Sequence, residues 1–194
     1  MPPKTKLSTE ELSFIGVMTS LSVATNYLML SLTNVKLMDL FVFVSGYLRG
    51  PLVGVLVGCF TWLIYGTLNP YGFSLPILIA TMSGESIYGI IGGLSSHFRV
   101  FGDFGFSSSF KGDVWSLNFK FAILGFFCTF IYDLYTNIIS GLVSGLPIVA
   151  ALILGIPFSL IHEVSNLILF FFGASILIGA IHRFTSKKEV SVYG

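Results

Sequence analysis

The chain has 194 residues, of which 54% are hydrophobic and only 10% are charged, with a formal net charge of +1. Soluble domains carry about 25% charged residues, so water could not solvate the surface of this chain if it folded as a globule. The composition therefore excludes a soluble domain, and the balanced charge excludes the basic stripe that nucleic-acid binding requires. We expect an all-α polytopic protein of the cell membrane, in contact with lipid and built as a single membrane domain, residues 1–194.

The first half of the chain predicts four membrane spans. The first, residues 12–32, follows a run of helix-capping residue types, Ser8-Thr9-Glu10-Glu11. Within it Gly16, Ser20 and Ala24 lie four residues apart, and such a stripe of small residues lets another helix approach closely. A polar break and the turn signals Arg49-Gly50-Pro51 and Asn69-Pro70-Tyr71-Gly72 separate the next three spans, which we place at residues 37–48, 52–67 and 75–94.

The second half holds one long polar connection, residues 95–117, which we expect to be a cytoplasmic interfacial loop. The apolar stretch that follows, residues 118–183, can form two long helices or three shorter ones. A seventh span would place the basic C-terminal segment outside, against the positive-inside rule. We therefore expect a bundle of six transmembrane helices with both termini cytoplasmic, the last two at residues 118–140 and 158–183.

With this topology the basic residues divide unequally between the two sides. Lys36 faces outside, and Lys120 lies near the inner side. The inside segments hold all of the others, namely Lys4, Lys6, Arg49, Arg99, Lys111, Arg183, Lys187 and Lys188.

Ionisable and amide side chains within apolar runs are costly in lipid, so they face a bundle interior or a watery cavity and mark function by default. Asp133 and Asn137 share one helix face, as do His162 and Asn166. We expect a substrate-binding pocket in the outer half, formed by the last three spans and covered by the loops after the first and third spans. The alternative is that these polar pairs only bridge helices. The candidate binding residues are Asn34, Lys36, Asp39, Asn69, Tyr71, Glu85, Tyr88, Asp133, Asn137, His162, Glu163 and Asn166.

Enzymatic and metal-binding patterns are incomplete. The sequence His162-Glu163-Val164-Ser165-Asn166 resembles the zinc motif H-E-x-x-H but ends in asparagine, so the second imidazole ligand is missing. The phosphate-binding pattern G-x-x-x-x-G-K-[ST] is absent from the sequence, so we do not expect the chain to hydrolyse ATP itself. We expect no catalytic residue, no metal and no cofactor.

One passage carries a family resemblance. The sequence from Gly46 to Gly58, GYLRGPLVGVLVG, resembles the G-x-x-x-G-P-x-x-G-x-x-x-G passage of the substrate-binding (S) components of energy-coupling factor (ECF) vitamin transporters. The small-residue stripe of the first span fits the same pattern. So do the polar loop leading through Lys36 and Asp39 into a short second helix, and a final span that follows Gly155-Ile156-Pro157 and ends in a basic tail. The resemblance covers residues 10–185.

The resemblance implies a six-helix protein that captures a vitamin-like solute outside for ATP-driven uptake. Its partners would be a transmembrane coupling subunit, which docks on Gly16, Ser20 and Ala24, and two cytoplasmic ATPase subunits. The nickel and cobalt branch of the family has an N-terminal histidine motif, whereas this chain begins Met1-Pro2-Pro3-Lys4, so we exclude that branch.

The excess of acids among the intramembrane residues favours a neutral or cationic, hydrogen-bonding solute with an aromatic part, which Trp62 or the tyrosines could stack on. A stand-alone secondary transporter or channel, with the acids relaying protons or cations, is the alternative function. The lack of an inverted repeat in the sequence argues against it. A membrane-embedded scaffold or enzyme is the third possibility.

Overall fold

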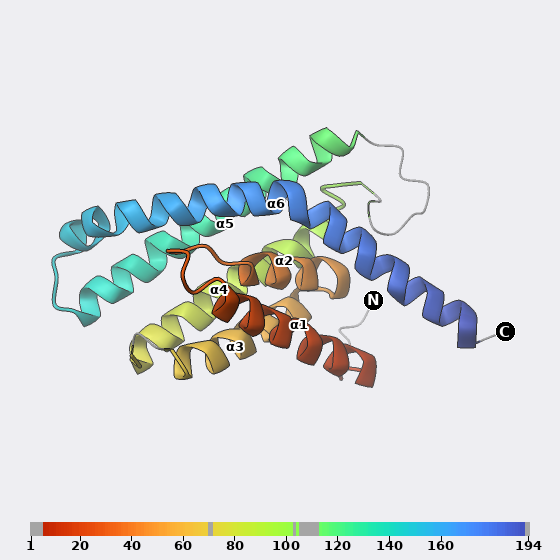
Figure 1. Ribbon diagram of the computed structural model, residues 1–194, viewed down its shortest axis with the longest axis horizontal. Coiled ribbons are helices and arrows are strands. Elements are labelled where there is room, and N and C mark those ends of the chain that lie inside the picture. Colours follow the sequence, from red (N-terminus) through yellow and green to blue (C-terminus); the bar gives the residue numbers. More distant parts are fainter. Residues whose placement is uncertain (1–5, 70–71, 103, 105–112, 193–194) are drawn as a thin grey trace.

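A computed structural model describes residues 6–69, 72–102, 104 and 113–192, and their side chains as far as Arg183. This described part of the chain contains six helices and no strand (Figure 1), which confirms the all-α prediction. The helices are α1 (Thr9–Leu28), α2 (Met38–Arg49), α3 (Pro51–Thr67), α4 (Leu75–His97), α5 (Val114–Val143) and α6 (Ile148–Val192).

Side-chain caps fix where two of the helices begin. The Ser8 hydroxyl accepts a hydrogen bond from the Glu11 N–H, while the Glu11 carboxylate accepts one from the Ser8 N–H, which forms a complete capping box at the start of α1. Asp113 accepts hydrogen bonds from the N–H groups of Trp115 and Ser116. For that reason α5 begins at Val114, ahead of the predicted residue 118.

The apolar stretch of residues 118–183 forms two helices, not three. Helix α6 begins at Ile148, and Pro157 lies inside it instead of preceding it. Proline removes one helical hydrogen bond, but long membrane helices tolerate it because neighbouring groups compensate. The expectation that the last helix starts at residue 158, after Gly155-Ile156-Pro157, is therefore wrong. Only a short connection with Gly145 at φ 70° separates α5 from α6.

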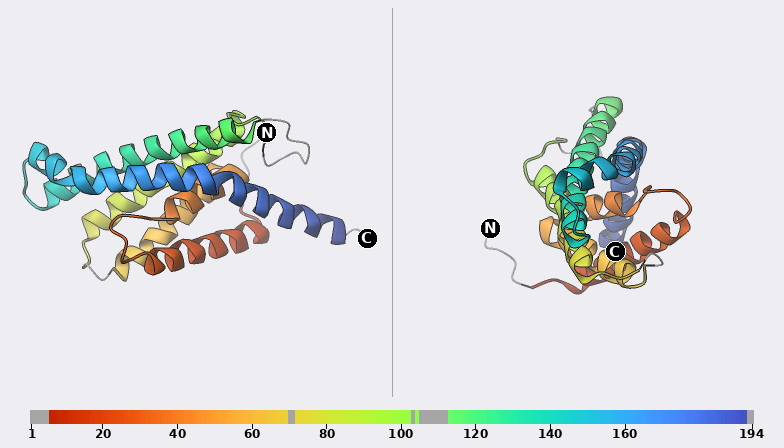
Figure 2. Two further views of the ribbon diagram at one scale, coloured as in Figure 1. Left: turned by 45° about the horizontal axis from the view of Figure 1, so that its top comes forward. Right: turned by 90° about the vertical axis from the view of Figure 1, so that its left-hand side faces the viewer.

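The helices surround α2. Helices α5 and α6 run side by side in opposite directions, and α2 lies between this pair and α1 (Figures 1 and 2). Every residue of α2 from Met38 to Tyr47 is buried. With 12 residues, at about 1.5 Å each, α2 is far shorter than the hydrocarbon core of about 30 Å. The helix at the second predicted span is thus covered by the rest of the protein.

Glycines bring α2, α3 and α4 into backbone contact. A Cβ atom added at Gly54 of α3 would lie 2.6 Å from the Cα of Gly89 in α4 and 2.8 Å from the Cα of Gly46 in α2. These distances are too short for any side chain. The glycine passage that carries the family resemblance is therefore, in this fold, the place where the three helices cross most closely.

Three helical stretches are long and apolar enough to cross a membrane among the residues that the structure describes: α4, α5 and the part of α6 from Ile148 to Arg183. Helix α3 is apolar but shorter. The coarse conclusion, a membrane protein with several long apolar helices, follows from these observations. The number of six spans, and the side on which the termini lie, stay predictions.

Candidate functional site

A cavity of about 720 Å³ lies between the end of α1, the loop that follows it, and helices α3, α4 and α5. Its wall is mostly polar, with amide, hydroxyl, ammonium and carboxylate groups beside four aromatic side chains. The lining residues are Asn26, residues 29–36, Trp62, Tyr65, Asn69, Thr81, Tyr132, Asp133, Thr136, Asn137, Ser140 and Phe158. Helix α6 contributes only Phe158, so the walls come from α3 to α5 and not from the last three helices alone.

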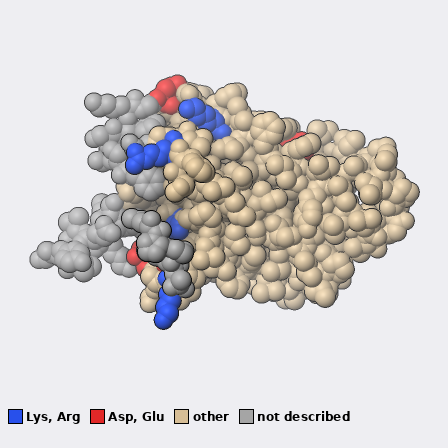
Figure 3. All heavy atoms as spheres, turned by 180° about the vertical axis from the view of Figure 1, so that it is seen from behind, with Lys and Arg blue, Asp and Glu red and all other residues tan. Residues whose placement is uncertain are grey.

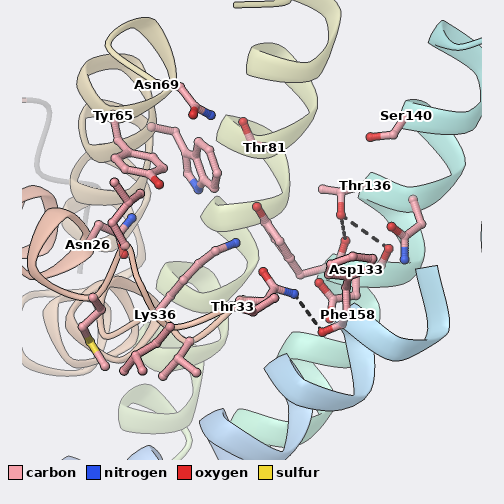
Figure 4. A pocket seen from close by; sticks show the side chains of 18 of the residues that line it. Asn26, Thr33, Lys36, Tyr65, Asn69, Thr81, Asp133, Thr136, Ser140 and Phe158 are labelled. Atoms are coloured by element: carbon pink, nitrogen blue, oxygen red, sulfur yellow. Dashed lines mark hydrogen bonds between the residues drawn. The ribbon is translucent and has the colours of Figure 1, made fainter. Parts of the chain in front are cut away.

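Lys36 extends its side chain into the middle of this cavity, with Tyr65 on one side and Asp133 on the other (Figure 4). Its Nζ atom lies 5.3 Å from the ring centroid of Trp62 and 5.5 Å from that of Tyr132, which are cation–π distances. No carboxylate of the described residues lies within 4.0 Å of it. Two aromatic faces, and no ion pair, thus hold the ammonium group in place.

The loop between α1 and α2 covers the cavity and is tied to α6. The Asn34 amide Nδ2 donates a hydrogen bond to the backbone oxygen of Phe158 at 2.9 Å (dashed in Figure 4). Asn34 has a φ of 54°, a left-handed conformation that asparagine adopts more readily than most residues. This hydrogen bond joins the covering loop to α6.

A buried chain of charged groups lies beside the cavity. His162 of α6 is fully buried; its Nδ1 lies 2.9 Å from Oδ1 of Asp133 in α5, and its Nε2 lies 2.6 Å from Oδ2 of Asp39 in α2. Carboxylates only accept hydrogen bonds, whereas an imidazolium donates from both nitrogens. A positively charged His162 therefore satisfies both acids at once and joins α2, α5 and α6.

Asn166, one turn after His162, extends this network. Its Nδ2 donates to Asp39 Oδ2 at 2.6 Å and to the Thr129 hydroxyl at 2.7 Å. The Tyr88 hydroxyl of α4 donates to the same Thr129 oxygen at 2.9 Å. The network thus includes a side chain from each of four helices, and all of these residues are buried.

Glu85 has a separate role at the back of the cavity wall. Its Oε2 accepts a hydrogen bond from the indole N–H of Trp62 at 3.1 Å, and its side chain is completely buried. This contact fixes the orientation of the Trp62 ring, whose face meets Lys36. Glu85 is therefore placed to position a wall residue and does not itself line the cavity.

Two acceptor atoms of the cavity lining have no hydrogen-bond partner. They are Oδ2 of Asp133 and Oδ1 of Asn26, and both residues are at least nine-tenths buried, at 6% and 4% exposure. Buried polar atoms are nearly always paired with protein or water. Both atoms are almost inaccessible from the cavity, so a molecule with donor groups would satisfy them only after these side chains turn toward it.

A smaller cavity, of about 250 Å³, lies between α5 and α6. Asp133 and Asn137 line it as well as the larger one, and Glu163 joins them there. The Asn137 amide donates to the Ser159 hydroxyl at 3.0 Å. Asp133 and Asn137 therefore form the wall between the two cavities.

The structure distributes the predicted binding residues over several places. Those that line the large cavity are Asn34, Lys36, Asn69, Asp133 and Asn137. Those that form the buried network beside it, together with Asp133, are Asp39, Tyr88, His162 and Asn166. Glu85 supports Trp62, Glu163 lines the smaller cavity, and Tyr71 lies outside the described residues.

Sequence reasoning missed several lining residues, among them Asn26, Thr81 and Thr136, and the network residue Thr129. Asn26 is an amide within an apolar helix, so the criterion that selected Asn137 would also have selected it. Thr129 lies one turn before Asp133 and so shares its helix face. Threonine is too common in membrane helices, where it bonds its own backbone as Thr129 does to Gly125, to be singled out by type alone.

The small-residue stripe of α1 lies on the outer surface. Gly16, Ser20 and Ala24 are exposed and line a shallow groove with Ser13, Val17 and Leu21. A Cβ atom added at Gly16 would meet nothing within 4 Å. No described helix of this chain packs against the stripe, which leaves it open to another protein or to lipid.

The site as a whole can bind a small polar molecule and shield it from the surroundings. The residues that the structure describes contain no group of three or more His, Cys, Asp or Glu side chains that could hold a metal ion. No family model, curated protein or solved structure matches this chain.

Proposed function

We propose that this chain is the substrate-specific membrane subunit of an ECF-type importer, which captures a vitamin-like solute from outside the cell. The observation that carries the proposal is the polar cavity of about 720 Å³, covered by a loop that Asn34 joins to α6 through a hydrogen bond. Sites for small molecules measure about 300–1,000 Å³ and combine apolar or aromatic walls with a few polar groups. The cavity has this size and this kind of lining.

The distribution of charge supports an outward-facing cavity. Lys and Arg gather at one end of the molecule, while the rest of the visible surface is almost free of charge (Figure 3). The covering loop lies away from that end. Because basic residues accumulate on the cytoplasmic side of membrane proteins, this arrangement supports a cytoplasmic position for both termini and access to the cavity from outside.

The open stripe on α1 supports a partner in the membrane. Helices in lipid associate through small residues that let their backbones approach closely, and α1 presents Gly16, Ser20 and Ala24 without covering them by its own chain. In the proposed function this stripe contacts a transmembrane coupling subunit, and two cytoplasmic ATPase subunits supply the energy that this chain has no motif to supply.

One observation favours a second candidate, a stand-alone transporter driven by protons or cations. Asp133 lines both cavities and contacts His162, while Glu163 lies in the smaller cavity. Acids in series across a membrane protein can relay protons. Uptake into liposomes that contain only this chain, driven by a proton gradient, would favour this candidate over the importer subunit.

The test of the proposed function is a thermal-shift screen of the purified protein against vitamins and related solutes. We expect one of them to raise the melting temperature saturably, because a ligand that binds only the folded protein stabilises it. Uptake of that solute into cells should then require the coupling subunit and the ATPases. Absence of stabilisation by every solute, or uptake without the partners, would contradict the proposal.

Filling the α1 stripe should separate binding from uptake. In the double variant Gly16→Leu/Ser20→Leu we expect an unchanged thermal shift with the solute, because both positions are exposed and far from the cavity lining. Co-purification of the coupling subunit and solute uptake should be lost. The matched control is Gly179→Leu in α6, where an added Cβ also meets nothing within 4 Å. If this control lost the partner equally, the stripe would not be the docking surface.

Removing the contact between loop and α6 should speed solute release. Asn34→Gly keeps the left-handed backbone accessible but loses the hydrogen bond to Phe158. One neutral hydrogen bond contributes about 0.5–1.5 kcal/mol, so we expect the dissociation rate to rise by roughly two- to tenfold in a filter-binding chase. The control Thr33→Gly adds the same loop freedom without removing the contact. Equal rates in the two variants would contradict the role of Asn34.

A further inference from the structure

The charged groups of the large cavity do not match the acidic interior expected from the sequence. Asp39 and Glu85 are hydrogen-bonded to other buried side chains and do not line the cavity. Asp133 lines it but is already paired on one oxygen with His162. The charge that reaches the middle of the cavity is the ammonium group of Lys36 (Figure 4).

This ammonium group lacks a hydrogen-bonding anion. The rings of Trp62 and Tyr132 attract it from 5.3 Å and 5.5 Å, but ring faces do not replace the strong acceptors that three N–H donors require. No described carboxylate lies within 4.0 Å of it. Charge-assisted hydrogen bonds are about twice as strong as neutral ones, and a low local dielectric strengthens them further. A ligand carboxylate at Lys36 would therefore bind strongly.

The unpartnered acceptors indicate that the ligand carries a hydrogen-bond donor as well. Oδ2 of Asp133 and Oδ1 of Asn26 belong to lining residues, are buried and accept no hydrogen bond from the protein. Leaving such an acceptor unpaired costs about 1–3 kcal/mol. A ligand N–H group would remove this cost once the side chain turns its acceptor toward the cavity, and neither a hydrocarbon nor a pure acceptor can do so.

We infer that the cavity binds a small solute with two features, a carboxylate that meets the ammonium group of Lys36 and an N–H donor that meets the free acceptor of Asp133 or Asn26. The inference rests on the proposed capture of a solute and names its chemical class. It replaces the neutral or cationic ligand expected from the sequence, because the acids counted there are engaged with His162, Asn166 and Trp62.

The competing explanation for Lys36 is purely structural. Its charge would then only offset the nearby acids Asp39 and Glu85, and its removal would weaken every ligand alike through loss of stability. The two explanations differ in one measurable respect, namely the preference of the protein for a carboxylate over the matching uncharged group.

Calorimetric titration with matched pairs of probes measures this preference. Each pair shares an N–H donor and differs only in the head group: biotin and biotinamide, pantothenate and panthenol, indole-3-acetate and indole-3-acetamide. We expect at least one acid to bind saturably and at least about tenfold more tightly than its uncharged counterpart, as one charge-assisted hydrogen bond requires. Methylation of the N–H of that acid should weaken binding by a similar factor.

Three variants assign the preference to Lys36. Lys36→Met keeps the apolar stem and should bring the Kd of the acid to within about threefold of that of its uncharged partner, while the Kd of the partner changes by less than about twofold. Lys36→Arg should keep part of the preference. Lys120→Met, which removes an exposed lysine that does not line the cavity, should behave as the original protein.

Three results would overturn the inference: equal binding of acid and uncharged partner, equal weakening of both in Lys36→Met, or no saturable binding of any acid. Each is separable from failure of the proposed function. If an uncharged vitamin binds and its uptake requires the partners, the proposed function stands and the inference fails. If the acid preference depends on Lys36 but uptake does not require the partners, the inference stands and the proposed function fails.

Discussion

Replacing His162 with alanine is expected to cost a large part of the stability of the fold. The imidazole lies between Asp39 at 2.6 Å and Asp133 at 2.9 Å, and none of the three side chains is more than 8% exposed. Removing it leaves two acids close together in the interior without a countercharge. Breaking a buried ion pair by removing one partner costs about 3–5 kcal/mol, a large part of a typical total of about 5–15 kcal/mol.

The measurement is the melting temperature of the purified protein in a fixed detergent, followed by helical circular dichroism. The variant His162→Phe separates charge from packing, since it fills the same space without donating a hydrogen bond, and we expect it to be as unstable as His162→Ala. His97→Ala removes an exposed histidine and should change little. A stable His162→Phe variant would show that the imidazole fills space and does not hold the acids.

The elements that the sequence predicts best are those with long apolar runs. The helices expected at residues 75–94 and 118–140 exist as α4 and α5, each slightly longer than predicted. The start of α5 could have been predicted from the sequence, because Asp113 is a residue type that commonly caps helices. The start of α6 was not readable, because the Gly155-Ile156-Pro157 pattern that usually ends or starts a helix lies inside one whose other contacts outweigh the lost hydrogen bond.

The role of α2 could not be predicted from its composition. Its sequence is mostly apolar, which is typical both of a membrane span and of a helix buried in protein. The deciding fact is that α1, α3, α4 and α6 all contact it, and this depends on tertiary structure. The glycines that permit the contact were visible in the sequence. Their partner Gly89 lies in a different helix, in the G-x-x-x-G pattern from Gly89 to Gly93, and such a pattern does not show which helix it will meet.

The candidate site, like the fold, could be predicted only in part from the sequence. Helical spacing correctly placed Asp133 and Asn137 on one face, and both line the cavity. Spacing could not show that His162 reaches Asp39, which is distant in the chain. For this reason a count of acids and bases overstated the acids of the cavity, because Asp133 lines it whereas Asp39 and Glu85 do not. Pairing in three dimensions, and not composition, decides which groups remain available to a ligand.

The second large effect is expected from a single methyl group at Gly89. A Cβ atom there would lie 2.6 Å from the backbone nitrogen of Val55 and 2.8 Å from the Cα of Gly54. Backbone atoms of a packed helix cannot rotate away as a side chain can, so α3 and α4 must separate and lose contacts along their length. Overpacking typically costs about 1–3 kcal/mol and more when the backbone must shift. We expect Gly89→Ala to lower the free energy of unfolding by more than this range.

Gly16→Ala is the matched control, because both glycines lie inside helices and only their neighbours differ. Alanine favours a helix over glycine by about 1 kcal/mol, and at Gly16 nothing lies within 4 Å of the added atom. We therefore expect Gly16→Ala to melt at the original temperature or slightly above it, and Gly89→Ala to melt far below it or to fail to accumulate. Since the same methyl group is added in both, the difference between the two melting temperatures measures the close approach of α3 and α4 alone. Equal melting temperatures would mean that these helices do not cross at backbone contact, and the cavity wall formed by Trp62 of α3 and Thr81 of α4 would then need a different arrangement.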